Sequence, residues 1–188
     1  MKVIAIAAVT AGGKTTTVNA VKSRLPNVRT LHFDDYVFEG EVEDFHQWVL
    51  DGADYNVWDL APLKEDILRI KKDENCDYLI LDYPFAYCNQ QIREYIDVAV
   101  FIDTPLDIAL ARWILRDMGD ASGEEIRNDL NGYLKYARAA FVQMQKDILP
   151  SSDHVIDGAA DKETIVENVI KIILECAERE HHGGFRYQ

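Results

Sequence analysis

Uninterrupted apolar runs alternate with runs of helical spacing along this chain of 188 residues. An apolar run without polar alternation is typical of a strand that is buried on both faces of a sheet. The segment KVIAIAA at 2–8 has this pattern and is predicted to be such a strand. Further strands are predicted over 28–33, 77–82, 98–103 and 154–157.

Apolar residues at helical spacing predict helices in the segments between these strands. Pro26 and Asn27 are predicted to end the first helix. Pro62 suits the first turn of a later helix, because the backbone N–H that proline lacks would have no partner within the helix there. The predicted helices cover 15–25, 41–50, 62–72, 105–116, 124–149 and 162–180.

This alternation predicts an α/β fold, a three-layer sandwich in which helices cover both faces of a five-stranded parallel sheet. The chain shows no internal repeat and no long linker, so we expect one domain over 1–180 and a flexible tail at 181–188. In such sheets, ligands bind beyond the carboxyl ends of the strands. The candidate residues below lie at such ends or in the helices that follow, which predicts a single site.

Composition and charge narrow the range of partners. Hydrophobic residues make up 48% of the chain, and 33 acidic against 20 basic residues give a formal net charge of −13. This charge repels nucleic-acid backbones and anionic membranes, so neither is expected as a partner. Three scattered cysteines without a CxxC pair suit a reducing compartment. The run at 2–8 is too short to span a membrane, and a cytoplasmic location is expected.

A glycine-rich loop joins the first predicted strand to the first predicted helix. It matches the phosphate-binding pattern G-x-x-x-x-G-K-[ST] at Gly13, Lys14 and Thr15, with Ala8 in the place of the first glycine. An alanine costs little at that position if its φ is negative. The alternative is an ordinary glycine turn before a helix, but the buried strand before it favours a P-loop. The expected fold class is therefore the P-loop NTPase sandwich.

The residue types of this loop suit a nucleotide triphosphate. Backbone N–H groups can surround a phosphate, and the helix N-terminus adds a favourable dipole. Lys14 is expected to reach the β- and γ-phosphates, and the Thr15 hydroxyl to ligate Mg²⁺, so ATP and Mg²⁺ are the predicted cofactors. The predicted nucleotide-binding residues are Ala11, Gly12, Gly13, Lys14, Thr15 and Thr16.

Carboxylates follow two other predicted strands, Asp34 and Asp35 after 28–33 and Asp82 at the end of 77–82. Across a cleft from a P-loop, one carboxylate can accept the proton of an attacking hydroxyl while another supports the metal. The alternatives are a turn in which aspartate caps the next helix, and a polar strand terminus. The P-loop context favours the functional interpretation.

Arg112 and Arg116 share one face of a predicted helix, since they are four residues apart. Arginine suits a phosphoryl group in transfer, whose charge is spread over several oxygens. The alternative is a surface salt bridge, for instance with Asp107 or Asp117. The segment 112–126 contains glycines and is predicted to be a short lid that excludes water when it closes.

These residues resemble the uridine kinase and nicotinamide riboside kinase group of P-loop kinases. The resemblance covers about residues 2–175 and is carried by LPN at 25–27 ahead of Asp34-Asp35, PLDIALARWILRD at 105–117, YLKY at 133–136 and VIDG at 155–158. It implies that Asp34 is the catalytic base, with Asp35 as a weaker candidate or helper. It also implies that Asp82 supports Mg²⁺ through water, although Asp82-Tyr83-Pro84 replaces the Glu-Gly that is common in the family.

The resemblance extends, with displaced spacing, to DYNVWD at 54–59, which is similar to the segment that contacts the sugar in these kinases. Aromatic rings can stack on a base, and hydroxyl or carboxylate groups can bind ribose. A place in the hydrophobic core is the alternative for the aromatic residues. The predicted substrate-binding residues are Asp35, Tyr36, Tyr55 and Asp59, and the predicted metal-binding residues are Thr15, Asp82 and Asp34.

The sequence thus predicts an ATP- and Mg²⁺-dependent kinase for a hydroxyl of a small metabolite, most simply a nucleoside such as uridine or nicotinamide riboside. Asp34, Lys14, Arg112 and Arg116 are the predicted catalytic residues. A nucleoside monophosphate kinase is disfavoured, because acidic residues and not arginines surround Asp34. A sugar or vitamin-type alcohol stays open as acceptor, and so does a regulatory nucleotide-binding protein without phosphate transfer.

Overall fold

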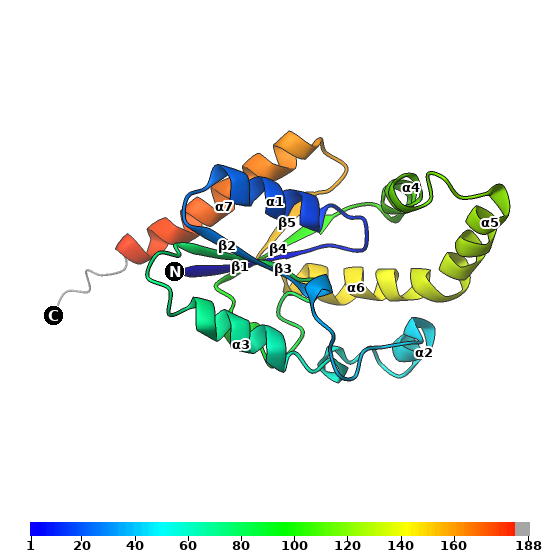
Figure 1. Cartoon of the computed structure of the whole chain (residues 1–188), viewed down its shortest axis with the longest axis horizontal. Coiled ribbons are helices and arrows are strands. Elements are labelled where there is room, and N and C mark those ends of the chain that lie inside the picture. Colours follow the sequence, from blue (N-terminus) through cyan, green and yellow to red (C-terminus); the bar gives the residue numbers. More distant parts are fainter. Residues whose placement is uncertain (183–188) are drawn as a thin grey trace.

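The computed structural model of the protein describes residues 1–182, with the side chains of residues 1–178 (Figure 1). Its strands form one parallel sheet in the order β2-β3-β1-β4-β5. The sheet confirms the predicted fold class, and each predicted strand is present with small shifts at its ends. The strands are β1 Lys2–Ala7, β2 Val28–His32, β3 Tyr78–Asp82, β4 Val98–Asp103 and β5 His154–Asp157.

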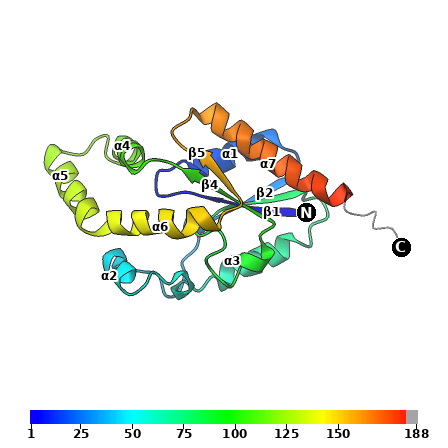
Figure 2. The same cartoon turned by 180° about the vertical axis from the view of Figure 1, so that it is seen from behind.

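Helices cover both faces of this sheet. Helices α1 and α7 lie on one face, and α3 and α6 lie on the other (Figures 1 and 2). None of the helices within residues 1–182 is long and apolar enough to cross a membrane. The helices are α1 Lys14–Arg24, α2 Phe45–Leu50, α3 Ala61–Ile70, α4 Leu106–Asp117, α5 Gly123–Gly132, α6 Arg138–Ser151 and α7 Lys162–His182, with single 3-10 turns η1 Phe33–Asp35, η2 Tyr55–Val57 and η3 Arg93–Tyr95.

Two predicted helices differ from the structure. The helix predicted over 124–149 is divided by a π-helical turn, η4 Tyr133–Ala137, and α5 and α6 run in different directions on its two sides (Figure 1). The helix predicted over 41–50 begins only at Phe45, because the Asp44 side chain accepts hydrogen bonds from the N–H groups that open the helix. Of the predicted tail, 181 and 182 end α7, and 183–188 lie outside the described residues.

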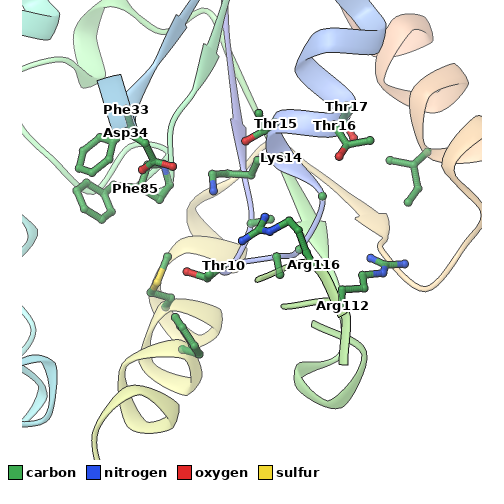
Figure 3. A pocket seen from close by; sticks show the side chains of 18 of the residues that line it. Thr10, Lys14, Thr15, Thr16, Thr17, Phe33, Asp34, Phe85, Arg112 and Arg116 are labelled. Carbon is green, nitrogen blue, oxygen red and sulfur yellow. The ribbon is translucent and has the colours of Figure 1, made fainter. Parts of the chain in front are cut away.

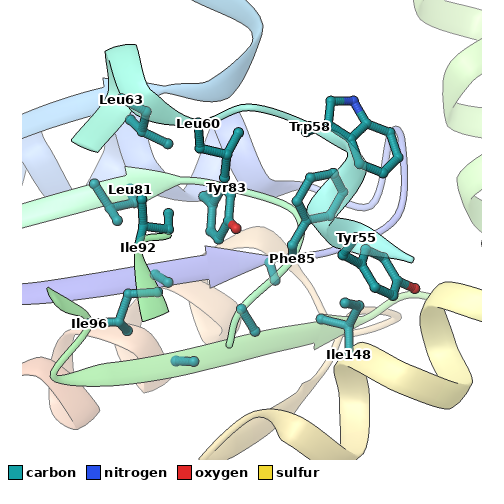
Figure 4. Packing of buried hydrophobic residues seen from close by; sticks show 14 of the residues in the cluster. Tyr55, Trp58, Leu60, Leu63, Leu81, Tyr83, Phe85, Ile92, Ile96 and Ile148 are labelled. Atoms are coloured by element: carbon teal, nitrogen blue, oxygen red, sulfur yellow. The ribbon is translucent and has the colours of Figure 1, made fainter. Parts of the chain in front are cut away.

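The core is divided by the sheet into two clusters, because successive strand residues point to opposite faces. From β1, Val3 and Ala5 pack on the side of α3 and α6, whereas Ile4 and Ile6 pack on the side of α1 and α7. The first cluster is rich in aromatic rings near the carboxyl ends of the strands (Figure 4). Both faces being buried explains the uninterrupted apolar runs, and the core holds the strand ends that carry the site in fixed register.

Candidate active site

The loop between β1 and α1 has the backbone geometry of a phosphate-binding loop. Its chain turns through left-handed conformations at Ala11 and Gly13, with φ of 56° and 102°. The Gly12 N–H donates to the Val9 carbonyl over 2.9 Å. A Cβ at Gly12 would lie 2.8 Å from both the Ala8 Cβ and the Val9 carbonyl oxygen, so glycine is required there.

Ala8 replaces the first glycine of the pattern without strain. In this loop, Ala11 and Gly13 have positive φ values, whereas the φ of Ala8 is not positive. Its methyl group is buried and faces Gly12, whose missing side chain leaves room for it. The condition under which an alanine costs little at this position is therefore met.

Two of the predicted metal-binding residues, Thr15 and Asp82, are in direct contact. The Thr15 hydroxyl donates to Asp82 Oδ2 over 2.6 Å, and Lys14 Nζ lies 3.8 Å from Oδ1. His32 Nδ1 lies 3.1 Å from Oδ2, a contact that sequence reasoning missed. The Asp82 side chain is only 5% exposed. A hydroxyl beside a carboxylate offers the oxygen ligands that Mg²⁺ prefers, with water and phosphate to complete the shell.

A cavity of about 600 Å³, here named the main cavity, opens at the carboxyl ends of the strands. Lys14, Asp34 and Arg116 point into it, whereas Arg112, which also lines it, points the other way, toward the turn after β5 (Figure 3). Asp34 reaches it because η1 follows β2 directly. The predicted residues that line the main cavity are Ala11, Gly12, Gly13, Lys14, Thr15, Thr16, Asp34, Arg112 and Arg116.

The two arginines are held in different ways. Arg116 donates to both carboxylate oxygens of Asp117, over 2.8 and 2.6 Å. That hydrogen bonding raises the pKa of Arg116, and the nearby charge of Asp34 adds to the effect. Arg112 donates over 3.2 Å to the carbonyl oxygen of Gly158, in the turn after β5. Arg116 therefore lines the main cavity and also forms the salt bridge that the sequence left open.

The segment predicted to be a lid comprises the end of α4, a short loop and the start of α5. The Ser122 side chain and Glu125 cap α5 reciprocally, since each accepts a hydrogen bond from the other's backbone N–H. Helices α4 and α5 lie at the end of the molecule beyond the strands (Figure 1). Closure of this segment stays a prediction.

Of the predicted substrate-binding residues, Tyr55 lies beside the main cavity. It lines an adjoining space of about 140 Å³, here named the aromatic cavity, together with Trp48 and Trp58. Its hydroxyl donates to Asp147 on α6 over 3.1 Å, and burial raises its pKa. Asp35 is exposed on η1 and does not line these cavities.

Tyr36 and Asp59 have structural partners on α3. The Tyr36 hydroxyl donates to Asp66 over 2.8 Å, and burial, followed by this bond, raises the pKa of Tyr36. Asp59 accepts from the backbone N–H of Ala61 at the start of α3. Neither residue lines the main cavity or the aromatic cavity. Their contacts therefore connect the segments that hold them to α3.

Sequence reasoning missed several residues of the main cavity. Phe33 and Phe85 follow β2 and β3, so the rule that ligands bind at strand ends could have identified them. Phe141 and Met144 lie three residues apart on α6, a spacing that equally indicates a core face. The residues missed in this cavity are Thr10, Thr17, Phe33, Glu41, Phe45, Pro84, Phe85, Phe141, Met144, Ala160, Lys162 and Ile165.

Comparisons with known proteins identify the family of the chain. Residues 55–164 match the model of the Phosphoribulokinase / Uridine kinase family. A uridine kinase of Borrelia hermsii is 27% identical over 183 residues, which cover 82% of this chain and 88% of that protein.

Solved structures share the fold. A putative fructose transport system kinase from a Silicibacter species superimposes with a TM-score of 0.56 at 13% identity, over 82% of this chain and 89% of that one. A shikimate kinase from Bacteroides thetaiotaomicron gives 0.53 at 15% identity, over 94% and 98%. At such identities the likeness concerns the fold alone.

Proposed function

Because this chain belongs to the phosphoribulokinase/uridine kinase family, we propose that the protein is an ATP- and Mg²⁺-dependent kinase that phosphorylates a hydroxyl of a small metabolite. One observation carries the proposal: Lys14, Asp34 and Arg116 line the same cavity. A phosphate-binding cation, a carboxylate for the acceptor and a cation for the charge in transfer are the groups that phosphoryl transfer requires.

The nucleotide side of the reaction uses the loop and the residues around Asp82. Backbone N–H groups of the loop bind the phosphates, and Lys14 neutralises charge on the group in transfer. Thr15 and Asp82 would hold Mg²⁺, which when bound supplies charge stabilisation at the phosphate oxygens. Their mutual contact of 2.6 Å supports this pairing.

The acceptor side uses Asp34. Its carboxylate accepts the proton of the attacking hydroxyl, which makes the oxygen a better nucleophile as it approaches the γ-phosphorus in line. Arg116 stabilises the negative charge that spreads over the equatorial oxygens after it leaves Asp117. Lid closure would exclude water, which competes with the acceptor hydroxyl.

The walls of the acceptor side favour an unphosphorylated acceptor with a flat ring, such as a nucleoside. Phe33, Trp58 and Phe85 contribute aromatic faces on which a ring can stack. Glu41 and Asp34 contribute carboxylates, which repel an acceptor phosphate. A sugar or a vitamin-type alcohol is the next candidate acceptor.

The test measures ADP release from Mg-ATP with a panel of nucleosides, nicotinamide riboside, simple sugars and pantothenate. We expect one class to stimulate turnover, and Asp34→Asn to lower that turnover about 10²- to 10⁴-fold. Asp35→Asn serves as the comparison, because its exposed carboxylate does not line the main cavity and the loss should be much smaller. ATP binding without stimulation by the whole panel would instead favour a regulatory nucleotide-binding protein.

A further inference from the structure

A buried threonine, Thr104, ties the phosphate loop to the strand beside it. Thr104 follows β4 and is fully buried, although its side chain is polar. Its hydroxyl donates a hydrogen bond to the carbonyl oxygen of Gly12 over 2.8 Å. Burial of a hydroxyl destabilises a protein unless the hydroxyl is hydrogen-bonded, and the partner of this hydroxyl lies in the proposed phosphate-binding loop.

The bond fixes the direction of one peptide group in that loop. In a trans peptide, the carbonyl and the following N–H point in opposite directions. Because Thr104 holds the Gly12 carbonyl on its own side, the N–H of Gly13 faces the other way, where Gly13 lines the main cavity. Two adjacent glycines would otherwise let this peptide rotate easily, since neither has a Cβ to restrict it.

The same threonine also contacts the turn after β5. A Cβ at Gly158 would lie 2.0 Å from the Thr104 hydroxyl oxygen, so this glycine leaves the space that the Thr104 side chain fills. The Gly158 N–H donates to the Asp103 carbonyl, and its carbonyl accepts from Arg112. Thr104 thus packs between the phosphate loop and the turn that holds an arginine of α4.

We infer that Thr104 is a positioning residue, which orients the Gly12–Gly13 peptide so that its N–H is ready to bind phosphate before the nucleotide arrives. The inference rests on the proposed function, because it assigns a role within nucleotide binding. Donors that are oriented in advance bind charge without the cost of reorganisation. Thr104 itself does not line the main cavity, so it acts through Gly12.

The test compares Thr104→Val, which keeps the shape and removes the hydroxyl, with Thr104→Ser, which keeps the hydroxyl. The Kd for Mg-ADP without acceptor and the KM for ATP should both rise about tenfold in Thr104→Val. A change of this size corresponds to the loss of about one oriented hydrogen bond. Thr104→Ser should stay within about twofold of the wild type. The kcat should change less than the KM, because Thr104 does not touch the acceptor.

A matched control is Ser152→Ala at the end of α6. Ser152 donates to the Ile148 carbonyl over 2.8 Å, the same kind of bond, and does not line the main cavity. It should leave the Kd for Mg-ADP unchanged, and thermal melting should show that every variant is folded. Gly158→Ala is a second perturbation of the same contact, since its methyl would meet both the hydroxyl and the backbone of Thr104, and it should also weaken the binding of Mg-ADP.

Distinct results separate the two proposals. Wild-type affinity for Mg-ADP in both Thr104→Val and Gly158→Ala would overturn the role of Thr104 and leave the kinase proposal intact. So would a Thr104→Ser variant as weak as Thr104→Val, because shape and not the hydroxyl would then matter. A wild-type protein that binds neither Mg-ATP nor Mg-ADP would overturn the proposed function itself, and the inference with it.

Discussion

Ala8 fills the space that a side chain at position 12 would need, so the effects of substitutions at Ala8 and Gly12 on the free energy of unfolding should not be additive. Gly12→Ala places a methyl group 2.8 Å from the Ala8 Cβ and equally close to the Val9 carbonyl oxygen. Real Cβ contacts essentially never fall under 3.0 Å, so the loop must shift. Ala8→Gly removes one of the two close contacts and should partly rescue Gly12→Ala.

The magnitudes follow from these contacts. Overpacking of this kind costs about 1–3 kcal/mol in the free energy of unfolding. Ala8→Gly alone should cost about 0.5–1 kcal/mol, because glycine adds conformational freedom to the unfolded chain. The double variant should recover about 1 kcal/mol relative to the sum of the single changes, since contacting residues couple by that amount. The Val9 carbonyl contact persists in it, so the rescue is incomplete.

Urea unfolding of the four proteins gives the coupling energy, and the KM for ATP of each gives the effect on the loop. Gly12→Ala should raise the KM for ATP, whereas Ala8→Gly should leave it near the wild-type value, because the loop already accommodates Ala8. Unfolding energies that add within about 0.3 kcal/mol would refute the reasoning, since independent sites behave in that way. The Ala8 methyl would then not lie against Gly12.

Three further outcomes are expected. Asp82→Asn should lower kcat/KM about 10²- to 10³-fold and raise the Mg²⁺ concentration needed for half-maximal rate, measured by Mg²⁺ titration; an unchanged Mg²⁺ dependence would contradict its role. Arg116→Ala should lower kcat by a similar factor with little change in melting temperature, because its pair with Asp117 is exposed. Tyr83→Phe should leave the free energy of unfolding in urea unchanged or raise it by up to about 1 kcal/mol. The reason is that the buried Tyr83 hydroxyl has no hydrogen-bond partner among the described residues.

The central strands of the sheet were predictable because they are buried on both faces and therefore mostly apolar, as in β4, Val98–Asp103, whose predicted and observed bounds agree. The edge strands β2 and β5 are partly exposed and carry polar residues. The break between α5 and α6 was not. The apolar spacing continues through η4, Tyr133–Ala137, without a proline or a polar cap, and a π turn adds no local sequence signal of its own. The turn contacts α2, which is far away in the sequence, and sequence periodicity does not report such contacts.

The site was predictable where it depends on the sheet and not where it depends on long-range partners. Asp34 follows β2 and Asp82 ends the neighbouring strand β3, so the parallel topology brings both to the edge where Lys14 begins α1. Tyr36 has the composition of a stacking residue, but its hydroxyl bonds Asp66 on α3, thirty positions away. Pairing at that range depends on how α3 packs, which no local pattern specifies.

Tyr83 stands where the sequence resemblance leads us to expect a glycine, and its ring packs against the aromatic side chains of the main cavity. Asp82 keeps the carboxylate opposite Thr15, and the next residue, Tyr83, turns into the core on the other side of the chain. Its ring centroid lies 6.0 Å from that of Phe33 and 5.5 Å from that of Phe85. Figure 4 shows Tyr83 beside Phe85. Phe33 and Phe85 both line the main cavity, so the tyrosine supports the aromatic wall from behind. A glycine there would leave that wall without support, because no ring would then pack behind Phe33 and Phe85.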